Sequence, residues 1–193
     1  MPINCKTHFS LLKAFSKCDK LAEKCKEYGY KACVMADINS ISGAMEFHDS
    51  CRKHGVKPIL GCDFGSYILI AKNKEGWFDL IKIVSQSGLP VFQDVAKRGN
   101  LICLTNEHQN GYQKLFGRNY FSYNYSSRAV YYVTPDEAEA HRILLCSGMK
   151  TTLPKVNSII QEGGEVDNQE FFESDGFYLP KPEEQWDKEE LEI

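Results

Sequence analysis

A chain of 193 residues, 42% of them apolar, is long enough for one sizeable core or for a core with a small appendage. Its formal net charge of -3 leaves no overall basic surface, which argues against coating nucleic acid as its main role. The first residues lack the apolar core of a signal peptide, and no apolar run approaches the length of a membrane span. We therefore expect a cytoplasmic protein.

The first expected elements are a short strand over residues 3–6 and a helix over 19–28 that Gly29 ends. A strand over 32–36 leads to Asp37, a helix follows, Gly55 ends it, and a second strand over 58–62 leads to Asp63. The helix is expected to bury an apolar stripe of Ile41, Ala44, Met45 and Cys51. A crossover of this length suits parallel strands, so both aspartates are expected at neighbouring strand ends, pointing into one pocket.

Strand and helix continue to alternate, with strands over 67–71 and 101–104 and helices over 75–86 and 91–97. Only one helix-sized piece, 107–116, precedes the strand candidates 120–125 and 128–133. The residues between these two strand candidates are too few to join them in parallel. The candidates should therefore form a hairpin, or one of them is not a strand. The sequence Thr134-Pro135-Asp136-Glu137 predicts a capped helix start. From Met149 the chain turns polar, irregular and acidic, which predicts a loop with at most a terminal helix.

Eight cysteines are scattered singly, at positions 5, 18, 25, 33, 51, 62, 103 and 146. They form no Cys-x-x-Cys pair and have no histidine partner at zinc-finger spacing. We expect reduced, mostly buried thiols rather than disulfides or metal ligands.

Several sequence blocks carry a family resemblance: THFSLLKA, ACVMADINSISGAMEF, VKPILGCDF, ILIAKNKEGWFDLIKIVS, TPDEAEAHRILLC and FYLPKPEE. In this order the chain resembles the PHP (polymerase and histidinol phosphatase) domain, and more narrowly the PHP domain at the start of bacterial DNA polymerase III alpha subunits. The resemblance implies an α/β fold, a distorted and truncated PHP-type β/α barrel with mostly parallel strands and an irregular acidic C-terminal segment. Residues 1–149 would form the core, and residues 150–193 an extension packed on it, with no polymerase palm.

Active PHP domains hold two or three metal ions at the carboxyl-end face of the barrel, and this chain departs from that ligand pattern. The positions that correspond to metal ligands or lie in their motifs are Asn4, Lys6, Asp37, Ile38, Asp63, Ser66, Glu107, Ala129 and Tyr131. Lysine has no lone pair for a metal, and only Asp37, Asp63, Glu107 and, after a register shift, His8 remain as weak candidates. The resemblance therefore implies no catalytic residues and no metal cofactor.

We expect the ammonium group of Lys6 to take the place of the metal ions. Two carboxylates without a cation would repel each other, and the Lys6 ammonium, at a lost histidine position, would reach Asp37 or Asp63, with Glu107 possible as a third partner.

Two classes of function compete. The first is a non-catalytic module of DNA replication that binds a replicative DNA polymerase or proofreading exonuclease subunit, or a second copy of itself; a virus-encoded copy would join, replace or block the host component. The second is a metal-dependent phosphoesterase acting on nucleotides or DNA ends through a rearranged site, which the ligand chemistry disfavours. A weaker third is a nucleic-acid-binding module, using Arg118, Tyr120, Tyr123, Tyr125 and Arg128. Those tyrosines are better explained as a cover for the core where outer helices are missing.

Overall fold

One five-stranded sheet forms the centre of the fold. The computed structural model describes residues 1–86, 89–122, 129–164, 166, 171 and 175–182. The strands, which neighbour one another in sequence order, are β1 (Ala32–Ile38), β2 (Lys57–Asp63), β3 (Ile68–Ala71), β4 (Leu101–Thr105) and β5 (Tyr120–Ser122). β1 and β4 pair in parallel with β2 and β5, whereas β3 is antiparallel to both of its neighbours. Two parallel bridges join Cys5 to Met35 of β1 and to Val130, so most of the pairings are parallel.

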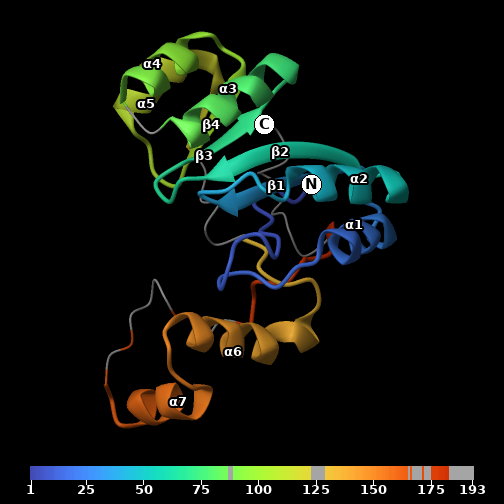
Figure 1. Ribbon diagram of the computed structural model, residues 1–193, viewed down its shortest axis with the longest axis vertical. Coiled ribbons are helices and arrows are strands. Elements are labelled where there is room, and N and C mark those ends of the chain that lie inside the picture. The colour runs from blue at the N-terminus through green and yellow to red at the C-terminus, as the bar shows by residue number, and fades with distance from the viewer. Residues whose placement is uncertain (87–88, 123–128, 165, 167–170, 172–174, 183–193) are drawn as a thin grey trace.

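The helices fall into two groups around this sheet (Figure 1). Their bounds are α1 (Cys18–Glu27), α2 (Ala44–His54), α3 (Lys74–Ser85), α4 (Leu89–Lys97), α5 (Asn110–Phe116), α6 (Ala138–Gly148) and α7 (Leu153–Gln161), with 3-10 turns η1 (Gly117–Asn119) and η3 (Pro135–Glu137). α1 to α5 lie next to the strands, and α6 and α7 lie together at the lower end of the molecule in this view.

Side chains alternate between the two faces of the sheet, as extended backbone requires. On β1, Cys33 and Met35 pack with α1 and α2, while Val34 and Ala36 pack with Ile68 on the opposite face. A second cluster, around β3, β4 and helices α3 to α5, continues the helix-covered face. Alternation therefore determines which strand-end side chains can meet.

The expected β1–α2–β2 unit is confirmed. The strands are parallel, and Gly55 ends α2 with a left-handed φ of 72°. The expected stripe on α2 is wrong in part, because Met45 is 70% exposed and Ile41 precedes the helix. Phe47 takes the buried position instead. The helix begins three residues later than Ile41, and its buried residues are Ala44, Phe47, Ser50 and Cys51.

The expected α/β class is confirmed, because helices alternate with the strands of one sheet. The described sheet is open, so the expected distorted and truncated barrel is not confirmed. β4 and β5 are parallel and are joined by the short helix α5. Residues 129–134 make the Val130 bridge but no regular strand, which matches the expected alternative that one of the two candidates is not a strand. Residues 123–128, where a hairpin turn was expected, lie outside the described residues.

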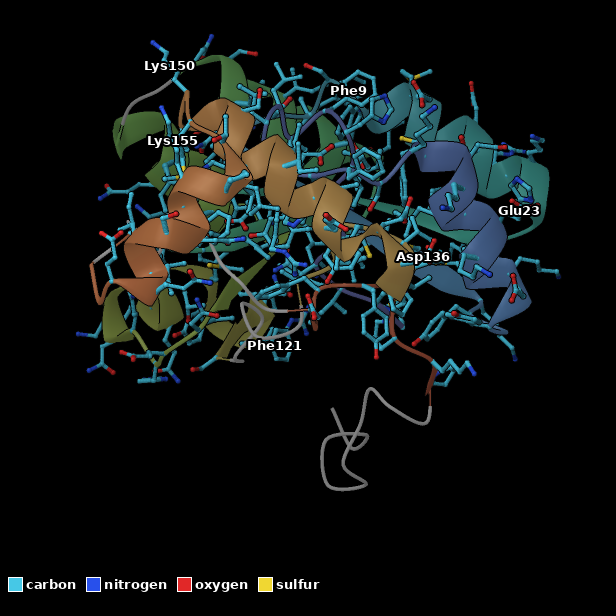
Figure 2. The ribbon with its side chains drawn as sticks, turned by 90° about the horizontal axis from the view of Figure 1, so that it is seen from below. Phe9, Glu23, Phe121, Asp136, Lys150 and Lys155 are labelled. Atoms are coloured by element: carbon cyan, nitrogen blue, oxygen red, sulfur yellow. The ribbon has the colours of Figure 1, made fainter. Side chains whose placement is uncertain are left out.

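The capped start at Thr134 is confirmed, with a capping box formed by Thr134 and Glu137 before α6. The expectation of an irregular chain after Met149 is wrong for residues 153–161, where α7 forms and packs beside α6 (Figure 2). The two helices share a small apolar cluster that includes Leu145 and Val156. The acidic last stretch, 183–193, lies outside the described residues.

After α7 the chain returns to the main core. The Phe177 carbonyl accepts a hydrogen bond from the Tyr131 N–H at 2.9 Å, and the Pro180 carbonyl accepts one from the Tyr30 hydroxyl at 2.8 Å. Leu179 is fully buried among side chains of α1 and β1. Among the described helices, none is long and apolar enough to cross a membrane.

Candidate functional site

The Lys6 side chain is fully buried at the carboxyl end of β1 and β2. Its ammonium donates hydrogen bonds to the Asp63 carboxylate at 2.5 Å, the Asn4 side-chain oxygen at 2.6 Å and the Ala36 carbonyl at 2.6 Å. An ammonium group has three N–H donors, and these partners occupy all of them. The predicted ion pair between Lys6 and one of the two strand-end aspartates is therefore confirmed, with Asp63 as the partner.

Burial lowers the pKa of the Lys6 ammonium, and the neighbouring Asp63 carboxylate opposes that shift. Asp63 is itself only 12% exposed at its side chain, and its second oxygen accepts the Gly65 N–H at 2.7 Å. The pair is compensated and hydrogen-bonded on both sides. Such a pair is costly to break, because removal of one partner leaves a buried charge alone.

Asp37 belongs to a different network. Its oxygens accept hydrogen bonds from the Thr7 N–H and hydroxyl, both at 2.6 Å, and from the Ser10 hydroxyl at 2.7 Å. Burial raises the pKa of the Asp37 carboxyl, and these hydrogen bonds act against the shift. Asp37 thus anchors the segment that follows the first bridge.

The expectation that Asp37 and Asp63 point into one pocket is wrong. The register places Asp37 beside Cys62 and Ile38 beside Asp63, so alternation sends the two carboxylates to opposite faces. Their separate partners agree with this. Glu107 does not join Lys6 either, because its side chain is exposed and the three ammonium donors are taken.

The remaining positions that the resemblance singles out differ in burial. Asn4 and Ala129 are buried, Ile38 is half-buried and Ser66 is exposed in the turn between β2 and β3. Burial raises the pKa of Tyr131 to about 12, with a smaller contribution from the charge of Asp63. The Tyr131 phenol is therefore neutral at physiological pH.

The suggested nucleic-acid contacts are only partly described. Arg118 is exposed, but Tyr120 is buried and its hydroxyl hydrogen-bonds Thr105 at 2.7 Å and the Gln109 N–H at 2.6 Å. Tyr120 is thus a core residue and cannot stack on a base in this conformation. Tyr123, Tyr125 and Arg128 lie outside the described residues.

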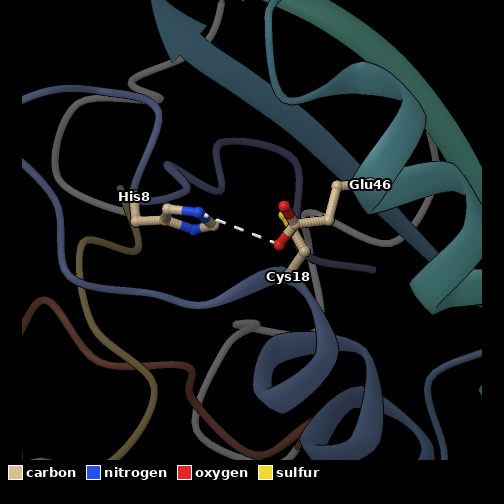
Figure 3. A group of neighbouring side chains, drawn as sticks. All are labelled: His8, Cys18 and Glu46. Carbon is tan, nitrogen blue, oxygen red and sulfur yellow. Dashed lines mark ion pairs between the residues drawn. The ribbon is translucent and has the colours of Figure 1, made fainter.

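One group in the described chain brings three metal-binding side chain types together: His8, Cys18 and Glu46, whose ligand atoms all lie within 4.8 Å of one another. Figure 3 shows the His8 ring directed toward the Glu46 carboxylate, with Cys18 beside it. Sequence reasoning placed His8 near the lost metal positions and missed the other two. Their spacing in sequence gives no signal, since three separate segments supply them.

Comparison with known proteins identifies the family. The sequence model described as "PHP domain" matches residues 3–180, nearly the whole chain. The chain belongs to the PHP family.

The curated relatives are DNA polymerase subunits of which this PHP chain matches a small part. A DNA polymerase III subunit alpha from Aquifex aeolicus is 44% identical over 57 residues, which is 30% of this chain and 5% of the relative. The Helicobacter pylori subunit is 31% identical over 126 residues, 54% of this chain and 10% of the relative. The chain thus spans a tenth or less of these relatives.

Among solved structures, the PHP chain is similar to a candidate metal-dependent phosphoesterase from Bifidobacterium adolescentis. The identity is 16%, the alignment covers 94% of this chain and 58% of the other, and the TM-score is 0.36. A score this low leaves the two folds only loosely superposed.

Proposed function

We propose that this PHP domain is a non-catalytic module of DNA replication that binds a replicative DNA polymerase or a proofreading exonuclease component. The observation that carries the proposal is the position of the Lys6 ammonium, 2.5 Å from Asp63 and held by three acceptors. The kinship with DNA polymerase III alpha subunits supports replication as the setting.

The Lys6 network argues against hydrolysis by the family's usual route. A metal at this place would have to displace a buried ammonium from a carboxylate, a carbonyl and an amide oxygen. Like charge would oppose the metal while Lys6 stayed protonated, and the vacated acceptors offer no imidazole ligand. Asp37 already accepts three hydrogen bonds from Thr7 and Ser10, and a metal would have to compete with them.

The segment between Lys6 and α1 supplies a surface that suits a protein partner. Leu11, Leu12 and Phe15 are 79%, 47% and 39% exposed, although their backbone is fixed. The Phe15 N–H donates to the Tyr131 carbonyl at 2.7 Å, and Leu12 is held in a left-handed conformation with φ of 59°. Apolar side chains displayed on a fixed and strained backbone are typical of a binding surface.

The test is capture of partners from the source cells with the purified chain as bait, followed by mass spectrometry. We expect a replicative polymerase or exonuclease subunit with the parent, and its loss with Leu11→Glu. Phe78→Glu is the matched control, because Phe78 is 51% exposed on α3 and lies outside the segment. Equal capture by both variants, or no replication subunit at all, contradicts the proposal.

The same preparation is assayed for phosphoesterase activity with magnesium, manganese and zinc on a phosphomonoester and on single-stranded DNA. We expect no turnover above the metal-only blank. Turnover that Asp37→Asn abolishes would replace the proposal with the phosphoesterase alternative.

A further inference from the structure

The geometry points to a transition-metal site, suited to Zn²⁺ or Co²⁺, formed by His8, Cys18 and Glu46. None of the three is among the positions that the resemblance matches directly to metal ligands, and the hydrogen-bond partners given above for Lys6 and Asp37 do not include them. Cys18 does lie against Thr7, which belongs to the Asp37 network. The inference thus goes beyond the proposed binding function and does not depend on it.

Three segments converge on this site, and each is fixed by its own backbone. His8 belongs to the segment that Asp37 anchors through Thr7, and its N–H donates to the Ser16 carbonyl at 2.9 Å. Cys18 is the first residue of α1, and Glu46 lies in the first turn of α2. Helices α1 and α2 pack against each other, so their starts are held together.

The spacing of the ligand atoms suits a tetrahedral ion. Bonds of about 2.0–2.3 Å to nitrogen, oxygen and sulfur place tetrahedral ligands about 3.3–3.7 Å apart. The His8 Nε2 atom lies 3.8 Å from a Glu46 carboxylate oxygen, and all three ligand atoms lie within 4.8 Å of one another. To reach tetrahedral spacing, the ligand atoms must approach one another by a fraction of an ångström to about 1 Å. Rotation of the Glu46 and His8 side chains, which are 50% and 40% exposed, can supply this movement.

The His8 ring is available as a ligand. Its Nδ1 atom is buried without a hydrogen-bond partner among the described atoms, and the 3.8 Å from Nε2 to Glu46 is longer than a hydrogen bond. The ring is oriented by packing against Phe9, with centroids 4.4 Å apart. Nε2, the ring atom that faces Glu46, is the one that would bind the ion.

The donor set selects the class of metal. A thiol, an imidazole and a carboxylate together suit Zn²⁺ or Co²⁺ rather than Mg²⁺ or Ca²⁺, which prefer oxygen alone. Burial raises the pKa of the Cys18 thiol to about 12, with the charge of Glu46 adding to the effect. A cation between Cys18 and Glu46 relieves the repulsion between the thiolate and the carboxylate. The cation binds with release of the thiol proton, so metal affinity rises with pH.

The test is a Co²⁺ titration of chelator-treated, reduced protein, read by absorbance and followed by Zn²⁺ competition. We expect about one equivalent of Co²⁺ with a thiolate-to-cobalt charge-transfer band that Zn²⁺ abolishes. Cys18→Ser should remove the band, while His8→Gln and Glu46→Gln should weaken binding at least about tenfold. Matched controls that should bind as the parent does are Cys146→Ser, His48→Gln and Glu23→Gln.

Circular dichroism shows whether Cys18→Ser folds; if it does not, the exposed Glu46→Gln variant decides. Absence of the band in the parent overturns the proposal. A band that survives Cys18→Ser, or binding unaffected by Glu46→Gln, also overturns it. Failure here leaves the partner-capture result unchanged, since that test involves none of these three side chains.

Discussion

Substitution of Lys6 by methionine tests whether the ammonium structurally replaces a metal. Methionine keeps the length of the side chain but takes the ammonium donor away from three acceptors: the Asp63 carboxylate, the Ala36 carbonyl and the Asn4 amide oxygen. A broken buried ion pair costs about 3–5 kcal/mol. Asp63 keeps the Gly65 N–H and has slight access to water, which favours the lower end, about 3 kcal/mol.

The assay is chemical denaturation with a thermal scan. For a chain of this size, a loss of about 3 kcal/mol lowers the thermal midpoint by roughly 6–12 °C. The double variant Lys6→Met with Asp63→Asn should recover part of the loss, because no buried charge remains. Lys53→Met is the matched control: Lys53 pairs with Asp19 at 2.8 Å, but both side chains are more than half exposed, so the midpoint should stay unchanged.

A Lys6→Met protein as stable as the parent would refute the structural role of Lys6. A double variant that recovers nothing would show that the loss comes from packing rather than from the stranded carboxylate.

Two further predictions concern local structure. Gly76→Ala should destabilise the protein by about 1–3 kcal/mol, because the new Cβ would clash with the Asn100 carbonyl oxygen; Gly111→Ala, with open space around it, should be neutral or slightly stabilising in the same denaturation assay. For Glu137, burial acts to raise the carboxyl pKa, but hydrogen bonds from Lys20 and two backbone N–H groups outweigh it and lower the pKa overall. The contribution of the charged Glu137 carboxylate to folding stability is therefore fully present above its unfolded pKa of about 4.3, and it is lost as pH falls through its folded pKa. The stability difference between the parent and Glu137→Gln should therefore shrink from pH 7 to pH 3. A difference that grows on acidification would contradict this sign.

Local patterns predicted the elements of this fold well wherever one segment contained the whole signal. The helix stop at Gly55 and the capped start at Thr134 depend on a few adjacent residues, and both are confirmed. Helix α7 was missed although Thr152 precedes it in extended conformation and Pro154 stands in its first turn. The polar composition around it concealed the spacing of Leu153, Val156 and Ile160, which pack with α6.

The site was harder to predict because it depends on register and on segments distant in sequence. The pairing of Lys6 with a strand-end carboxylate followed from the lost histidine position and is confirmed. Which carboxylate it meets depends on side-chain alternation, and that placed Asp37 on the other face. The meeting of His8, Cys18 and Glu46 depends on how α1 packs against α2, and no local pattern encodes this packing.

The two strand-end carboxylates are satisfied in different ways. Asp63 is neutralised by a covalently attached cation, whereas Asp37 is satisfied by the N–H and hydroxyl groups of Thr7 and Ser10. Both networks fix the segment between Lys6 and α1. The ion pair with Asp63 holds Lys6 at the start of the segment, and the hydrogen bonds to Asp37 hold Thr7 and Ser10 in the turn that follows. That segment carries His8 at the proposed metal site and Leu11 on the proposed binding surface. This one segment would then serve as the framework for both proposed sites. The two sites remain separable because Glu46 lies on α2 and Leu11 contributes no ligand.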